Sequence, residues 1–312
     1  SGISLEDIQQ NDLLIKNNGV ISTLPFNILV KNYNEDPQNY ETVSWLVDNN
    51  NIINIASFKY FFTNKEKKSI SKNFLGIGDP DFKKKEKEIK LANKDNNDAL
   101  NKLLVSRSNK QTNFILDQLP ETEDEIRKIS KFFSNKNYKL FLSKNASESK
   151  IKTTDLINYS YIIFATHAIP ESETGNSQIS GLALSYPKIV NDLDNGFLNS
   201  KEIMNINLNS ELVLLSACET ATDNQAAGRA FAGMVNSFFF AGSNSVIASH
   251  WKIESNSTVK ITTNFFKNLI DDEINTAASL RKSVLDFKKN NKEFNHPAFW
   301  GAFSVILNSR QL

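Results

Sequence analysis

The chain has 312 residues, a formal net charge of +1, three histidines and one cysteine. Its length allows one large domain or two small ones with a substantial core. The single cysteine excludes an intrachain disulfide framework and argues against a cysteine-based metal site, and the balanced charge argues against broad nucleic-acid binding. No apolar run approaches the roughly 20 residues that span a bilayer, and no signal peptide opens the sequence, so we expect a cytoplasmic protein.

Residues 1–70 are dominated by short β-like runs, of which 24–30 and 51–56 are the clearest. We expect them to form a β-rich N-terminal part packed against a larger second part, residues 71–312. The second part begins with a buried strand over 73–78, which the turn signal Asp79-Pro80 closes. Segment 82–112 then mixes Lys, Glu and Asn with few large apolar residues, which is typical of a solvated polar insertion.

After this insertion, helix-like and strand-like patterns alternate. The sequence Thr122-Glu-Asp-Glu125 reads as a capping box, and it is followed by apolar residues at helical spacing. Strands are expected at 138–142, 161–166, 212–216, 244–249 and 299–307, and helices at 226–241 and over two later amphipathic stretches. The continuous apolar runs 161–166 and 212–216 are typical of strands buried on both faces. The alternation predicts an α/β fold of three layers around a mostly parallel sheet.

Two reactive side chains follow the two most apolar strands. His167 comes directly after the run 161–166, and Cys218 comes just after the run 212–216. Ligands of open parallel sheets bind at the carboxyl ends of the strands, and neighbouring strands are only about 4.8 Å apart. The pair can therefore form a dyad in which the thiolate is the nucleophile and the imidazole is the general base. The alternative is a buried Cys218 that packs as a small hydrophobe and a hydrogen-bonded, structural His167.

The surrounding motifs resemble those of the CHAT domain, a caspase-like peptidase family related to separase. The two hallmark motifs are matched by Phe164-Ala-Thr-His-Ala168 and Leu214-Leu-Ser-Ala-Cys-Glu-Thr220. Further segments match in order along the chain: Leu24-Pro-Phe26, Gly76-Ile-Gly-Asp-Pro80, Leu119-Pro-Glu-Thr-Glu-Asp-Glu-Ile126, Ser180-Gly-Leu-Ala-Leu184, Ser245-Val-Ile-Ala-Ser-His-Trp251 and His296-Pro-Ala-Phe-Trp-Gly-Ala-Phe303. The resemblance covers nearly the whole chain and implies a caspase-like three-layer sandwich, with residues 71–312 as its catalytic domain.

The resemblance also implies residue roles. Cys218 matches the nucleophile and His167 the general acid and base, and the main-chain N–H groups of Cys218 and Ala168 match the oxyanion donors. Most relatives have Gly where this chain has Ala168, so the N–H of Ala168 can serve only if its φ is negative or the strain is tolerated.

Four further residues are candidates for substrate binding. His250 and Trp251 end the segment that resembles the substrate groove, and Glu254 and Asp79 are the acidic candidates for a pocket that takes a basic side chain. An alternative for Glu254 is an N-terminal cap on the helix that begins near Ser255. His296 is expected to be a structural cap or packing residue.

The sequence therefore predicts a cysteine endopeptidase that cleaves protein or peptide substrates without a cofactor or metal. The resemblance implies control by an activating protein partner or by an attached tetratricopeptide-repeat region. One alternative is a protease-like interaction module that binds a polypeptide without cleaving it. A nucleotide-binding protein is disfavoured, because Gly76-Ile-Gly78 lacks the third glycine of a phosphate-binding loop.

Overall fold

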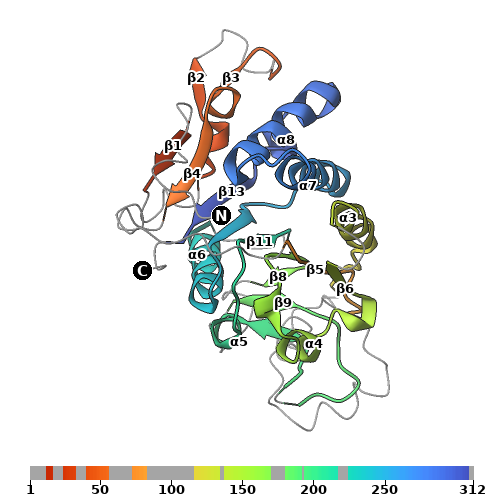
Figure 1. Cartoon of the computed structure of the whole chain (residues 1–312). Coiled ribbons are helices and arrows are strands. Elements are labelled where there is room, and N and C mark those ends of the chain that lie inside the picture. Colours follow the sequence, from red (N-terminus) through yellow and green to blue (C-terminus); the bar gives the residue numbers. More distant parts are fainter. Residues whose placement is uncertain are drawn as a thin grey trace, which may run out of the picture.

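The computed structural model describes residues 12–16, 24–32, 40–55, 72–82, 116–133, 137–169, 180–191, 193–216 and 224–308, without the side chains of 224–231. Its centre is an eight-stranded sheet with the order β1-β4-β13-β12-β11-β7-β5-β6 (Figure 1). The strands are β1 (Asp12–Ile15), β4 (Asn51–Ile55), β5 (Phe74–Gly78), β6 (Tyr138–Leu142), β7 (Tyr161–Ala165), β11 (Leu212–Leu215), β12 (Ser245–Ser249) and β13 (Phe303–Leu307). All neighbours in the sheet are parallel except β12 and β13.

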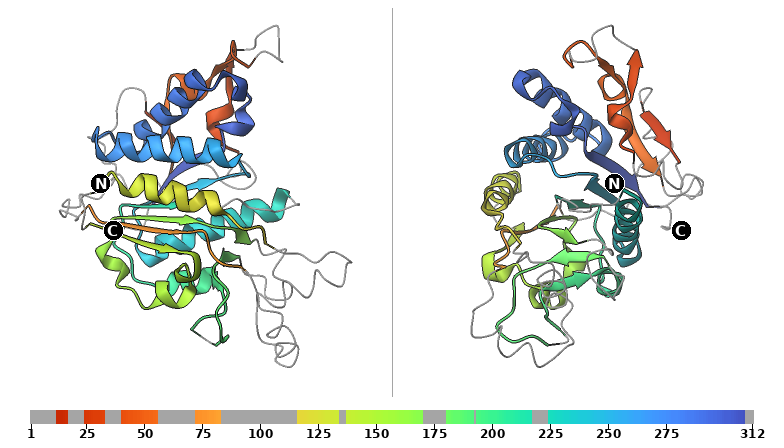
Figure 2. Two further views of the ribbon diagram at one scale, coloured as in Figure 1. Left: turned by 90° about the vertical axis from the view of Figure 1, so that its right-hand side faces the viewer. Right: turned by 180° about the vertical axis from the view of Figure 1, so that it is seen from behind.

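Helices cover both faces of this sheet. One face packs against α3 (Pro120–Ser130), α7 (Ser255–Ile270) and α8 (Thr276–Asn290). The other face packs against α4 (Glu148–Lys152), α5 (Ser200–Asn205) and α6 (Asn224–Ala241). Figure 2 shows the two groups of helices on opposite sides of the strands. The molecule is therefore an α/β sandwich of three layers with a mostly parallel central sheet, as the caspase-like assignment predicts.

Burial on both faces explains why the central strands read as continuous apolar runs. Successive side chains of a strand point to opposite faces of the sheet. In β7, Ile163 packs in the core beneath α3 and α7, whereas Ile162 and Phe164 pack in the core beneath α6. Because neither face of β7 meets water, polar residues at alternate positions would be buried without partners. The strand predictions for 161–166 and 212–216 are confirmed to within one residue at the carboxyl end.

Three predicted elements were wrong in detail. Segment 24–30 is not one strand, because a 3₁₀ turn at Phe26–Ile28 precedes the short strand β2 (Val30–Asn32), which pairs with β3 (Ser44–Trp45). Likewise, a 3₁₀ turn at Pro297–Phe299 precedes β13, so the last strand begins at Phe303.

The capping box at Thr122 was the third error. Helix α3 begins earlier, with Leu119 as its N-cap and Pro120 at its first position, where a proline is favoured because no N–H is needed there. The Thr122 hydroxyl instead donates to the Leu119 carbonyl over 2.7 Å and accepts from the Asp79 amide over 2.7 Å. Thr122 thus ties the first turn of α3 to the end of β5.

The N-terminal part extends the central sheet. Strand β4 pairs in parallel with β13, so the two parts of the chain share main-chain hydrogen bonds. Arg281 of α8 also donates to the carbonyl oxygens of Val47 and Asp48, and the Asn27 amide donates to the Phe303 carbonyl. Residues 56–71 and 83–115 lie outside the described residues, so the boundary near residue 70 and the polar insertion 82–112 stay predictions. In the part of the chain that the structure describes, no helix combines the length and apolarity needed to cross a bilayer.

Candidate active site

Strands β7 and β11 are direct neighbours in the sheet, and their carboxyl ends lie at the same edge. They pair in parallel with Leu215 opposite Phe164. The Ser216 amide continues the ladder and donates to the Phe164 carbonyl over 3.0 Å. His167 is therefore at the strand edge where ligands of parallel sheets bind. Cys218 falls in segment 217–223, outside the described residues, so its assignment as nucleophile stays a prediction.

His167 is held at this edge by its surroundings. Only 7% of the residue is exposed, and its Nε2 atom lies 2.8 Å from the main-chain oxygen of Asp117. A carbonyl only accepts, so in the neutral ring Nε2 carries the proton and Nδ1 is free to accept one. The ring of Phe82 packs at 5.4 Å between ring centroids. Burial lowers the pKa of His167 below its ordinary value, and the charge of Lys252 acts in the same direction, against the opposing effect of the Asp117 carbonyl. The imidazole is thus mainly neutral near pH 7, as a general base requires.

The residue after the histidine begins a small antiparallel sheet. Strand β8 (Ala168–Ile169) pairs with β9 (Gly181–Ala183), which pairs with β10 (Phe197–Asn199). The segment Ser180-Gly-Leu-Ala-Leu184, which matches the family in sequence, thus supplies the strand that pairs with the residues after the histidine. The His167 carbonyl accepts from the Ala183 amide over 2.9 Å. Because hydrogen-bonded and non-hydrogen-bonded pairs alternate in such a ladder, Ala168 and Leu182 form a non-hydrogen-bonded pair, and the Ala168 N–H points away from β9.

The backbone of Ala168 also meets the condition that a side chain imposes at this position, which is that φ is not positive. Among the described residues other than glycine, positive φ occurs only at Asp79, Ser143 and Glu273. Ala168 therefore has no positive-φ strain, and its assignment as an oxyanion donor stays a prediction.

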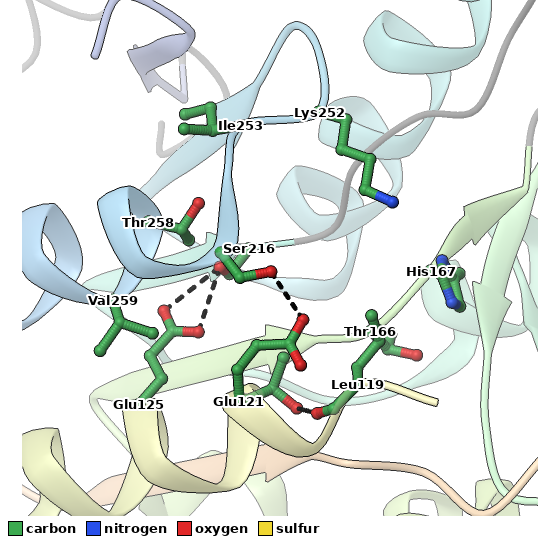
Figure 3. Close-up of a pocket in the computed structure, with 12 residues that line it drawn as sticks. Leu119, Glu121, Glu125, Thr166, His167, Ser216, Lys252, Ile253, Thr258 and Val259 are labelled. Atoms are coloured by element: carbon green, nitrogen blue, oxygen red, sulfur yellow. Dashed lines mark hydrogen bonds between the residues drawn. The ribbon is translucent and has the colours of Figure 1, made fainter. Parts of the chain in front are cut away.

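A cavity opens beside His167, between the ends of β7 and β11, the start of α3 and the segment that joins β12 to α7 (Figure 3). Its walls combine apolar, hydroxyl and charged side chains, so it offers both apolar surface and hydrogen-bonding groups. The lining residues are Leu119, Glu121, Thr122, Glu125, Thr166, His167, Ser216, Lys252, Ile253, Ser255, Thr258 and Val259.

Glu125 is the functional candidate that our reading of the sequence missed. It is 1% exposed, and its carboxyl oxygens lie 3.2 and 3.4 Å from the Ser216 hydroxyl (Figure 3). Burial raises the pKa of Glu125 to about 7, although hydrogen bonds from Thr262 and Ser216 lower it. The sequence signal was its spacing, because residues 122, 125, 126 and 129 fall on one helix face, and an acid on such a face is buried. The sequence pattern instead predicts a capping box for Glu125, and no side-chain cap is present at the start of α3.

The candidate substrate residues after β12 are engaged with the C-terminal segment. The Nε2 atom of His250 lies 2.8 Å from the Ser304 hydroxyl, and the indole N–H of Trp251 donates to the Ala298 carbonyl over 2.9 Å. Neither residue is among those that line the cavity, although Lys252 and Ile253, which directly follow Trp251, are. Their contribution to substrate binding stays a prediction.

Glu254 caps helix α7, which was the alternative interpretation from the sequence. One carboxyl oxygen accepts from the Asn256 amide over 2.9 Å, and the other accepts from the Ser257 amide over 2.8 Å. Partial burial alone would raise the pKa of Glu254, but these bonds lower it overall. Glu254 is not among the residues that line the cavity. The acidic residues that do line the cavity are Glu121 and Glu125.

Asp79 lies at the end of β5 with a positive φ of 45°. Its pKa is raised, first by partial burial and then by the charges of Glu123, Asp81 and Glu121. It is likewise absent from the cavity lining, and its assignment to a substrate pocket stays a prediction.

His296 has the structural role that we expected. Its Nδ1 atom accepts from the Ala298 amide over 3.1 Å and so caps the 3₁₀ turn Pro297–Phe299, while its ring packs edge-on against Tyr40. Within the described ranges, no three His, Cys, Asp or Glu side chains come together as a metal site would require.

Comparison with known families gives one match. The model of the CHAT domain matches residues 4–308, which is nearly the whole chain. No curated protein matches the chain. The matched range includes every strand of the central sheet and both hallmark motifs, so the match and the fold point to the same family.

Proposed function

Because this chain belongs to the CHAT domain family, whose fold is caspase-like, we propose that it is a cysteine endopeptidase that cleaves protein or peptide substrates with a His167–Cys218 dyad. One observation carries the proposal, which is the register of β7 against β11. Phe164 pairs with Leu215, and His167 and Cys218 each follow three residues after these two in the sequence. The chain spans at most about 3.6 Å per residue, so Cys218 lies within about 7 Å of Ser216, measured between Cα atoms.

The environment of His167 suits the first step of this reaction. Nδ1 of the neutral imidazole takes the proton of the Cys218 thiol, and the thiolate attacks the carbonyl carbon of the scissile peptide bond. The Asp117 carbonyl accepts from Nε2 and so holds the ring in the tautomer that leaves Nδ1 free. The resulting imidazolium then protonates the leaving nitrogen, the C–N bond breaks, and a thioester joins the substrate to Cys218.

Hydrolysis of the thioester completes the cycle. Nδ1 takes a proton from water, the hydroxyl attacks the thioester carbon, and the C–S bond breaks as the thiol regains its proton. Charge develops on the carbonyl oxygen in both steps. The Ala168 N–H, which points away from β9, is suited to stabilise it together with the N–H of Cys218. Water is the second reactant, and every other group in these steps belongs to the chain or to the substrate.

The proposal also assigns to the cavity beside His167 the binding of the substrate side chain that precedes the scissile bond. The proposal further includes a cytoplasmic location and activation by a protein partner or by an attached tetratricopeptide-repeat region. The presence of both His167 and Cys218 favours hydrolysis over binding alone, because a module that only binds a polypeptide has no need of either group.

The test is cleavage of a peptide library and labelling by an acyloxymethyl ketone, for the wild-type chain and for Cys218→Ala. We expect hydrolysis and labelling of the wild type, and neither for the variant, whose melting temperature should be nearly unchanged because the substitution is small. Hydrolysis by the Ala variant at the wild-type rate would contradict the proposal. A wild-type chain that binds peptides from the library but neither cleaves them nor reacts with the probe would favour the interaction module.

A further inference from the structure

Glu125 is a buried acid on the inner face of α3, and it lines the same cavity as His167. Its side chain points from the helix toward the end of β11 (Figure 3). Within the described part of the chain it has no ion pair with a lysine or arginine, and an isolated buried carboxylate is costly. A purely structural contact at this point could be made by an amide or an apolar side chain at less cost. The presence of an acid at this buried position therefore indicates a role beyond packing.

The contact made by Glu125 falls on the residue that leads into the nucleophile segment. Ser216 directly follows β11 and stands two residues before Cys218. Its amide is fixed to β7 by the bond to the Phe164 carbonyl, and its hydroxyl is fixed to α3 by the bonds to Glu125 at 3.2 and 3.4 Å. Ser216 is thus held from two layers of the fold. Both attachments therefore fix Ser216, the last described residue before the segment that holds Cys218.

We propose that Glu125 is a positioning residue for the reaction, which acts through Ser216 to set where the thiol of Cys218 stands relative to the imidazole of His167. This inference rests on the proposed function. A displacement of reacting groups by about 1 Å can cost on the order of 100-fold in rate. A single bond at the point where β11 ends can therefore affect catalysis through the geometry of the nucleophile.

Several charged or titratable groups lie around Glu125, so its protonation state affects the electrostatics of the cavity. Glu121 faces it from the same helix, His167 lines the cavity from the end of β7, and Lys252 lines it from the segment after β12. Helix α7 presents only uncharged groups to the cavity and to Glu125, among them Val259 and Thr262. Because burial raises the pKa of Glu125 to about 7, the carboxyl group gains its negative charge near pH 7.

Four variants test the proposal by steady-state kinetics. Glu125→Ala and Ser216→Ala should each lower kcat by about 10-fold to 100-fold, and the loss in kcat should exceed any rise in KM, because both residues line the cavity but their shared contact sets the geometry of the nucleophile. The double variant should lose no more than either single variant, since both remove one shared contact. Glu125→Gln should keep a clearly higher kcat than Glu125→Ala at pH 6, because its carbonyl oxygen still accepts from Ser216.

Glu123→Gln is the matched control. Glu123 lies on the same helix but pairs with Arg127 on the surface, and it is not part of the cavity. We expect its kinetics to match those of the wild type.

A second measurement does not depend on peptidase activity. Cys218 is the only cysteine of the chain, so the rate of alkylation by iodoacetamide reports on this thiol alone. Its dependence on pH should differ between wild type and Glu125→Gln above about pH 7, because only the wild type gains a negative charge there, and should be the same in Glu123→Gln. Glu125→Ala and Ser216→Ala should both alter the rate while the protein remains folded by circular dichroism.

The two proposals can fail separately. A wild-type chain without hydrolytic activity contradicts the proposed function, and the alkylation measurements still decide whether Glu125 acts on Cys218. The positioning role is overturned if the folded Glu125→Ala protein keeps wild-type kcat and the wild-type alkylation profile. It is also overturned if the single effects of Glu125→Ala and Ser216→Ala simply multiply in the double variant.

Discussion

The main-chain oxygen of Asp117 accepts a hydrogen bond from Nε2 of His167 at 2.8 Å, across 50 residues of sequence. Asp117 precedes helix α3, whereas His167 follows β7, so the bond connects the helical layer to the edge of the sheet. It fixes both the ring orientation and the tautomer of the imidazole. The acceptor of this bond is a main-chain carbonyl, which does not gain or lose a proton at the pH values at which proteins are folded. The orientation of His167 is therefore maintained at all pH values at which the fold persists.

The first prediction concerns the protonation of His167 itself. In Cys218→Ala, where no thiol shares the proton, NMR titration should give His167 a pKa below 6.5, because burial is the largest effect on it. Phe82→Ala removes a ring that packs against the imidazole and should move this pKa upward, as water reaches the charged form more easily. Comparison with His167→Gln assigns the signal among the three histidines. A pKa above 6.5 in Cys218→Ala would contradict the argument from burial.

The second prediction concerns the rate. His167→Ala should lower kcat/KM by several orders of magnitude, because the thiol then has no base and the leaving amine has no acid. His296→Asn is a matched control, since Asn can replace the cap on the 3₁₀ turn and His296 takes no part in the proposed reaction. The control should keep wild-type kinetics. A His167→Ala rate within about tenfold of wild type, which corresponds to about 1.4 kcal/mol in the barrier, would show that His167 is not the general base.

The third prediction separates the two roles considered for Glu254. As an N-cap, Glu254→Ala should lower the free energy of unfolding by about 1 kcal/mol and affect substrates with basic and apolar P1 residues equally. Glu254→Ser, which keeps a capping oxygen, should recover much of this loss. The pKa of Glu254 is lowered in the folded protein, so the stability contributed by its charge is present above pH 4.5 and is lost as the pH falls through the folded value. A selective loss on substrates with Arg or Lys at P1 would instead support a pocket role.

The fourth prediction concerns stability and pH. The pKa of Glu125 rises from 4.5 to about 7 on folding, so the folded chain binds more protons than the unfolded chain between these values. The free energy of unfolding should therefore fall as pH rises through this window. From pH 5 to pH 8 the wild type should lose roughly 2–3 kcal/mol more than Glu125→Gln, which has no charge to bury. Urea unfolding of both proteins at the two pH values measures the difference. Parallel pH dependence of the two would contradict a raised pKa at Glu125.

The elements of the central sheet were predictable because their signal is local. Strands β7 and β11 are buried on both faces, and their uninterrupted apolar runs follow from that environment alone. The same holds for the helix that buries Ile126 and Ile129, whose spacing is visible in the sequence. The start of that helix was mispredicted, because the choice between Thr122 and Leu119 as N-cap depends on the Asp79 amide, which lies 43 residues away.

The sequence by itself determined the composition of the proposed dyad, the α/β class and the resemblance to the CHAT domain, since each depends on residue types in order along the chain. Only the tertiary structure decided the partners of the side chains. In the structure, Glu254 caps α7, the Asp117 carbonyl accepts from His167, and the Ser216 hydroxyl donates to Glu125. The last two contacts join residues 50 and 91 positions apart. The physical reason is that the packing of α3 on the sheet creates both of them, and no local pattern in the sequence encodes which buried acid meets which strand end.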